Sequence, residues 1–152
     1  MKAYKHQRKF VVKLMPRKLI PKTRCNNTWS ESQYSSFIKS ALRRASTRWK
    51  PKYDTKKQAR LKQKKMGAKG RMVFFSKCNA CKKSYPETTC SVDHIIPIID
   101  PATGFTTWDD VIEKLFCDSN NLQVLCKTCH DKKTAKEKKV ATERRKLNKL
   151  DK

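Results

Sequence analysis

Four cysteines in this chain of 152 residues are spaced as the ligands of one metal ion. They form two C-x-x-C pairs, Cys78 with Cys81 and Cys126 with Cys129. The tight turn of a C-x-x-C motif presents two thiolates to one ion, and two such turns complete the tetrahedral four-sulfur site of a structural zinc. A redox function is the weaker interpretation, because neither pair lies in the strand–helix setting of a thioredoxin-like motif. We therefore expect Zn²⁺, bound for structure and not for catalysis.

Polar residues of the kinds used in catalysis lie in and beside the segment between the two pairs. Asp93 and His94 are neighbours inside the apolar run SVDHIIPII. Asn121 precedes the run LQVLC, and His130 directly follows the second pair. Neighbouring residues of a strand point to opposite faces, so Asp93 and His94 cannot both face an apolar core. Taken singly, each residue has a simpler interpretation: His130 as a zinc ligand, Asp93 as a hydrogen-bonding residue at a strand end, and Asn121 as a turn residue.

Three further cysteines, Cys25, Cys90 and Cys117, are expected to pack as small buried hydrophobes. Seven cysteines are an odd number, and the first 21 residues lack the apolar core of a secretory signal. This favours a reducing compartment, where paired cysteines bind metal before they form disulfides. We therefore expect a cytoplasmic protein.

Short helices and strands must position these residues, and hydrophobic periodicity predicts where they lie. Strands are expected over residues 71–78, 91–99 and 121–126. Helices are expected over residues 31–49, 54–67, 106–116 and 130–150. The first helix has a capping box of Ser30 and Gln33, and Pro51 limits its end. The second is capped by Asp54 and the third by Thr106 or Thr107. GAKG at 67–70 indicates a hinge. The pattern is that of an α+β protein.

The charge of the chain is large and unevenly distributed. The formal net charge is +25, from 38 basic and 13 acidic residues. Residues 1–70 carry 22 basic and 2 acidic side chains, residues 71–135 carry 8 of each, and residues 136–152 carry 8 and 3. This predicts a basic helical DNA-binding extension over 1–70, a near-neutral core over 71–135 and a basic C-terminal helix or tail over 136–152.

Such a field makes nucleic acid the expected partner. A membrane is the rival, but no run approaches the roughly 18 apolar residues of a span. The basic face of the first helix supplies the predicted phosphate contacts: Lys39, Arg43, Arg44 and Arg48. A merely solvated face is the alternative for each of them. Lys127, Lys132 and Lys133 are left open between phosphate contacts and a solvated helix face.

The motifs together resemble the HNH endonuclease family, which folds as a ββα-metal unit. The matching segments are VDHIIP at 92–97, NNLQVLCKTCHDKKT at 120–134 and CNAC at 78–81. The resemblance covers roughly residues 72–135. The chain has Asp93 at the first motif position, where the family's name has His, and Asp keeps a metal ligand there. The basic helix before this region looks like the N-terminal region of phage-encoded HNH proteins, which would place the protein in the cytoplasm of a host cell.

The resemblance implies a role for each polar residue. His94 is the general base, and Asp93 and His130 hold one divalent cation, Mg²⁺ or another. Asn121 orients the imidazole of His94. Double-stranded DNA is then the substrate, and no small molecule is. The alternative is a zinc-stabilised nucleic-acid-binding protein without catalysis, which explains the charge and the cysteine pairs but not the four polar residues together.

Overall fold

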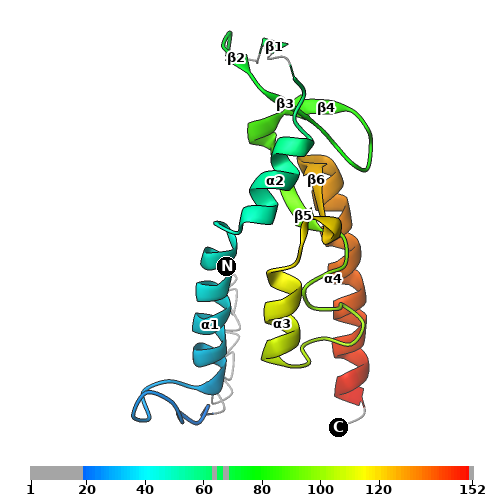
Figure 1. The fold of residues 1–152 in the computed structure, drawn as a ribbon. Coiled ribbons are helices and arrows are strands. Elements are labelled where there is room, and N and C mark those ends of the chain that lie inside the picture. The colour runs from blue at the N-terminus through cyan, green and yellow to red at the C-terminus, as the bar shows by residue number, and fades with distance from the viewer. Residues whose placement is uncertain (1–18, 63–64, 67–68, 151–152) are drawn as a thin grey trace, which may run out of the picture. The chain divides into compact units, whose positions relative to one another are not determined.

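The computed structural model describes residues 19–62, 65–66 and 69–150 (Figure 1). They divide into two compact units, which meet between Ile38 and Lys39 within helix α1 (Glu31–Ser46). Helices and small antiparallel sheets are mixed along the chain, so the expected α+β class is confirmed. Within the described residues, no helix is long and apolar enough to cross a bilayer. The division of the sequence at residues 70 and 135 stays a prediction.

The first unit contains the capping box that the sequence predicts. Ser30 N donates to Gln33 Oε1 at 2.8 Å, and Gln33 N donates to Ser30 Oγ at 3.3 Å. Two otherwise unpaired N–H groups at the start of α1 are thereby satisfied. The prediction for Cys25 is wrong: it is exposed, with φ of 51° in a turn of three left-handed residues that ends at Asn27.

The helix boundaries after α1 differ from the prediction. α1 ends at Ser46, and α2 (Lys50–Gln58) starts with Pro51 in its first turn, so this proline begins a helix and Asp54 lies inside it. Proline is tolerated in a first turn because its missing N–H would be unpaired there. Among the described residues, the predicted helix over 54–67 is wrong beyond Gln58, because the chain then bonds to β3 (Phe75–Lys77): Leu61 N donates to Phe75 O at 2.8 Å.

The strands of the described chain form three antiparallel pairs. They are β1 (Lys65–Met66) with β2 (Met72–Val73), β3 (Phe75–Lys77) with β4 (Ser84–Pro86), and β5 (Cys90–His94) with β6 (Leu122–Cys126). The strand predicted over 71–78 is therefore split, and the one over 91–99 ends at His94. Part of the predicted hinge, residues 67–68, lies outside the described residues. A 3-10 turn, η1 (Glu87–Thr89), precedes β5, and another, η2 (Ser119–Asn121), precedes β6.

The pair β5–β6 lies at the centre of the second unit. Its register runs from Cys90 opposite Cys126 to His94 opposite Leu122. Both α2 and α4 (Lys127–Leu150) pack against these two strands. α3 (Trp108–Leu115) begins with Thr107, whose hydroxyl accepts from Asp110 N at 3.2 Å, so the second of the two predicted caps is used. The buried apolar residues of this unit are Cys78, Cys90, Val111, Leu115, Leu122, Val124, Leu125 and Cys126.

Candidate functional site

The two cysteine pairs come together as the sequence predicts. The four sulfurs lie within 4.8 Å of one another. Cys78 and Cys81 belong to the turn after β3, whereas Cys126 ends β6 and Cys129 lies in the first turn of α4. Zn–S bonds of about 2.3 Å place tetrahedral sulfurs about 3.8 Å apart, so small side-chain adjustments suffice to enclose one ion. The cluster could thus hold a metal such as zinc.

The surroundings of the sulfurs favour a thiolate at Cys78 and a thiol at Cys129. Cys126 N donates to Cys78 Sγ at 3.3 Å. Burial raises the pKa of Cys78, but N–H groups of Cys126, Cys81 and Ala80 outweigh it and bring the value to about 6. A hydrogen bond with Cys126, together with burial, raises the pKa of Cys129 to about 12. Sulfurs this close cannot all be negative without a cation, which is the chemistry of a metal site.

Of the remaining cysteines, Cys90 is buried, as expected, and Cys117 is half-buried. Neither belongs to the cluster of four sulfurs. The cluster packs on Leu125, which is 2 % exposed, and on Tyr85. The hydroxyl of Tyr85 lies 3.8 Å from Cys81 Sγ. Cys78 and Cys126 are buried, whereas Cys81 and Cys129 are half-buried, so the cluster lies at the edge of the core.

Asp93 and His130 meet beside this cluster. Asp93 Oδ1 on β5 lies 4.0 Å from His130 Nε2 in the first turn of α4. Oxygen and nitrogen ligands bind divalent cations at about 2.0–2.2 Å. Two atoms 4.0 Å apart can therefore reach one ion from opposite sides. His130 lies next to a cysteine of the cluster, but its imidazole contacts carboxylates, those of Asp93 and Asp131.

Lys133 is a residue whose role the sequence leaves open. Its Nζ lies 2.9 Å from Asp93 Oδ2, 2.7 Å from His94 O and 2.8 Å from Glu137 Oε1. Burial alone would lower the pKa of Lys133, but Glu137 and Asp93 raise it above its ordinary value. The ammonium thus ties α4 to the end of β5. The signal in the sequence is the helical spacing of His130, Lys133 and Glu137, which places them on one face.

The carboxylate of Asp93 retains capacity for a ligand. Oδ2 is buried and accepts no well-aligned hydrogen bond from the described residues, although the ammonium of Lys133 is close. The ammonium of Lys133 compensates the charge at Oδ2, so Oδ1, which faces His130 Nε2 at 4.0 Å, is the oxygen left for a metal ion. Asp93 and His130 therefore fit the chemistry of a divalent cation, one oxygen ligand and one nitrogen ligand.

His94 is buried, with 8 % of its surface exposed. Its Nε2 lies 3.4 Å from Leu115 O. A carbonyl only accepts, so this contact places the proton on Nε2 and leaves the lone pair on Nδ1. Burial lowers the pKa of His94, against the raising effect of the Leu115 carbonyl. The imidazole is therefore neutral near pH 7 and can accept a proton.

Asn121 holds the backbone that follows His94. Its Oδ1 accepts from Ile96 N at 2.8 Å, and its Nδ2 lies 3.5 Å from Ile96 O. Its own carbonyl accepts from Ile95 N at 2.9 Å. The sequence predicts that the amide orients the imidazole, whereas its hydrogen bonds here go to the chain two residues further on. The difference arises because β5 ends at His94 and leaves the next N–H and C=O groups without a strand partner.

A cavity of about 240 Å³ joins these groups to the basic face of α1. Asp93, His94 and Lys133 line it together with Lys39 and Arg43, and apolar side chains of α3 and of the loop after β5 complete its walls. Arg44 and Arg48 are exposed and do not line it. Two of the four predicted DNA contacts thus share a cavity with the predicted base, and the other two face solvent.

Comparison with known proteins gives no relative. Neither a scan against family models nor searches of curated proteins and of solved structures found a match.

Replacing one cluster cysteine should remove the metal and unfold the second unit, because structural zinc contributes directly to folding. We expect Cys78→Ser to lose bound zinc, measured by elemental analysis, and ordered structure, measured by circular dichroism. Cys25→Ser, at an exposed thiol outside the cluster, should change neither. A Cys78→Ser protein that stays folded without zinc would refute the four-cysteine site.

Replacing Lys133 by Met should destabilise the protein, because the largely buried carboxylate of Asp93 would lose its cationic partner. Removing one partner of a buried polar pair costs about 1–3 kcal/mol. Lys132→Met changes the same charge at an exposed neighbour and should stay within about 0.5 kcal/mol of the parent. Urea unfolding of the metal-loaded proteins measures both. Equal stability of the two variants would show that the contacts of Lys133 contribute nothing.

Proposed function

We propose that the chain is a metal-dependent endonuclease of the HNH type, which hydrolyses phosphodiester bonds of double-stranded DNA. The observation that carries the proposal is the approach of Asp93 Oδ1 to His130 Nε2 within 4.0 Å, with His94 next in the chain. Strand β5 carries Asp93 and His94, helix α4 carries His130, and Asn121 directly precedes β6, the strand that pairs with β5. This arrangement beside a four-cysteine cluster is what a ββα-metal unit with structural zinc requires.

The chemistry of the substrate explains the residue types. A phosphodiester is negatively charged and repels hydroxide, so its hydrolysis needs a base for water, positive charge at the phosphate and fixed geometry. A cation held by Asp93 and His130 would stabilise the negative charge that develops on the phosphate and the leaving oxygen. His94 accepts the proton of the attacking water at Nδ1, while the Leu115 carbonyl fixes its Nε2–H.

Lys133 and Asn121 act on this site through other groups. Lys133 holds the Asp93 carboxylate and the His94 carbonyl to α4. Asn121 accepts a hydrogen bond from the backbone N–H of Ile96. Both ends of the short segment that carries the base are thus fixed, which keeps the imidazole in one position as the substrate binds.

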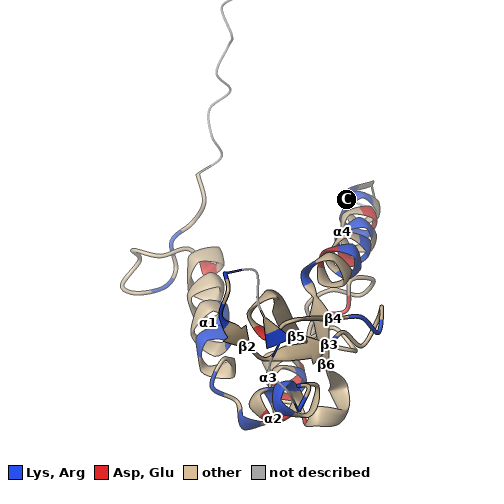
Figure 2. Ribbon diagram, turned by 90° about the horizontal axis from the view of Figure 1, so that it is seen from above, with Lys and Arg blue, Asp and Glu red and all other residues tan. Residues whose placement is uncertain are grey.

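The basic side chains supply the DNA contact. Lys and Arg are distributed along α1, α2 and α4 (Figure 2). Lys39 and Arg43 line the cavity that also holds His94, so a phosphate held by them would lie close to the base. Arg44 and Arg48 are free to contact the backbone further along the duplex. The contacts recognise phosphate and not sequence.

A zinc-stabilised DNA-binding protein without catalysis is the second candidate, since the cysteine cluster and the charge support it equally. Plasmid DNA incubated with the purified protein separates the two. The nuclease nicks or linearises plasmid when Mg²⁺ or Mn²⁺ is added and stops when EDTA is added. Added Mg²⁺ must restore cutting in a sample whose zinc content is unchanged, because EDTA could also remove structural zinc. A zinc-loaded protein that binds plasmid and leaves it intact with every divalent cation would support the second candidate.

His94→Ala should abolish cleavage and leave zinc content and DNA affinity nearly intact, because His94 belongs to neither the cluster nor the basic face. Loss of a general base lowers a rate by about 10²- to 10⁴-fold. The measurement is single-turnover cleavage at saturating protein, with binding followed separately without added metal. Cleavage at the parent rate would contradict the assignment of the base.

Replacing Arg43 and Arg44 by Gln should weaken binding similarly for duplexes of unrelated sequence. Each lost phosphate contact should flatten the slope of log K against log salt by about 0.9. The single variants separate two functions: Arg43→Gln, at the cavity, should also slow cleavage at saturating protein, whereas Arg44→Gln should change affinity alone. Unchanged salt dependence of the double variant would show that α1 does not bind phosphate.

A further inference from the structure

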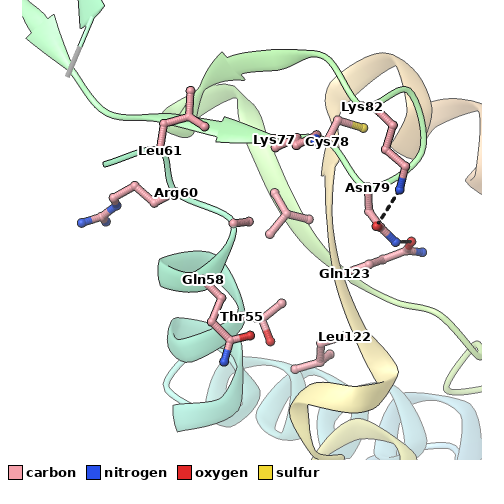
Figure 3. A pocket seen from close by; sticks show the side chains of 12 residues that line it. Thr55, Gln58, Arg60, Leu61, Lys77, Cys78, Asn79, Lys82, Leu122 and Gln123 are labelled. Atoms are coloured by element: carbon pink, nitrogen blue, oxygen red, sulfur yellow. Dashed lines mark hydrogen bonds between the residues drawn. The ribbon is translucent and has the colours of Figure 1, made fainter. Parts of the chain in front are cut away.

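A second cavity, of about 550 Å³, opens at a place that the proposed catalysis does not use. Its walls come from the end of α2 with the residues that follow it, from the segment 77–82 at the end of β3, and from the first half of β6 (Figure 3). Neither Asp93, His94 nor His130 lines it. Three segments distant in the sequence thus meet at one hollow beside the cysteine cluster.

The lining of this cavity is positive. Three cationic side chains and no carboxylate line it. Arg60 is neutralised, since its guanidinium donates to both oxygens of Glu87, at 2.6 and 2.8 Å. In the described part of the chain, no carboxylate pairs with Lys77 or Lys82. Their charges therefore remain available to an anion.

A chain of hydrogen bonds directs further donors into the same hollow. Lys82 Nζ donates to Asn79 Oδ1, and Asn79 Nδ2 donates to Gln123 Oε1, each at 3.2 Å (Figure 3). Both acceptor oxygens are used within the chain. Among the described residues, the side-chain groups left without a partner here are N–H donors: those of the Gln123 amide and the remaining protons of Lys82. A ligand rich in acceptor oxygens matches this set.

The register of the central strands connects the cavity to the proposed site. Gln123 is directly opposite Asp93 in the β5–β6 pair. Partners in an antiparallel pair have Cα atoms about 4.5–5.5 Å apart and side chains on the same face. One nucleotide advances a DNA strand by about 3.4 Å along the axis. A backbone that crosses Asp93 therefore reaches Gln123 within a few nucleotides.

We propose that this cavity binds a backbone phosphate of the DNA that flanks the cut, with Lys77 and Lys82 as its cations and Gln123 as an amide donor. The phosphate contact itself needs only DNA binding; its place beside a cut rests on the proposed nuclease function. It would be a second phosphate contact besides the basic face of α1, next to the turn that carries Cys78 and Cys81.

The test compares Lys82→Gln with Lys83→Gln. Lys83 is the next residue, is exposed and does not line the cavity. Duplex binding is measured over a range of salt, without added divalent cation so that nothing is cut. Lys82→Gln should weaken binding about 5- to 10-fold, the size of one charge-assisted contact, and flatten the salt slope by about 0.9. Lys83→Gln should change both far less.

A third variant tests whether a loss of DNA binding comes from misfolding. Gln123→Leu removes a donor without changing charge, so it should weaken binding and leave the salt slope unchanged. Zinc content and circular dichroism must match the parent for all three variants. The proposal is overturned if Lys82→Gln and Lys83→Gln bind alike. It is also overturned if inorganic phosphate at matched ionic strength abolishes the difference between them, because the cavity would then take a free anion.

The outcomes separate this proposal from the nuclease function. A parent protein that binds DNA and never cuts, with Lys82→Gln defective in binding, removes the nuclease and keeps the phosphate site. A parent protein that cuts DNA, with all three variants binding normally, keeps the nuclease function and removes the phosphate site.

Discussion

Four sulfur atoms within 4.8 Å of one another are the constraint on which the second unit depends. Mutual repulsion of thiolates at that separation opposes folding until a cation neutralises them. With a cation bound, the four sulfurs would link the turn after β3, the end of β6 and the first turn of α4. Every other feature of the proposed site is placed relative to that junction: His130 follows Cys129 directly, and β6 runs back from Cys126 to hold β5 in register.

The second link is made by Lys133. Its position one turn after His130 lets the ammonium contact Asp93 and the His94 carbonyl at once. The cysteine cluster fixes where α4 begins, and Lys133 fixes how the helix faces β5. The cysteine cluster and the pair of Asp93 and His130, whose Oδ1 and Nε2 lie 4.0 Å apart, are thus linked through the first turns of α4.

Local chemistry made part of this predictable from sequence. The C-x-x-C spacing, the Ser30–Gln33 capping box and the Thr107 cap each involve residues within three positions of one another, and each was confirmed. Hydrogen bonding between distant segments could not be predicted from the sequence. One example is α2, which ends at Gln58 because residues 59–61 bond to β3. The same holds for Asn121, whose amide satisfies backbone left unpaired by the end of β5. The prediction that Cys25 is buried was wrong for another reason, since composition cannot reveal a left-handed turn.

The length of α4 bears on how much DNA the proposed complex would include. Its 24 residues rise about 1.5 Å each and make a rod of about 36 Å, close to one turn of B-DNA. The rod begins at the cysteine cluster, and exposed cations such as Lys138, Arg145 and Lys149 follow it outward. In the proposed complex with DNA, contacts along this helix would therefore extend over about ten base pairs from the cysteine cluster.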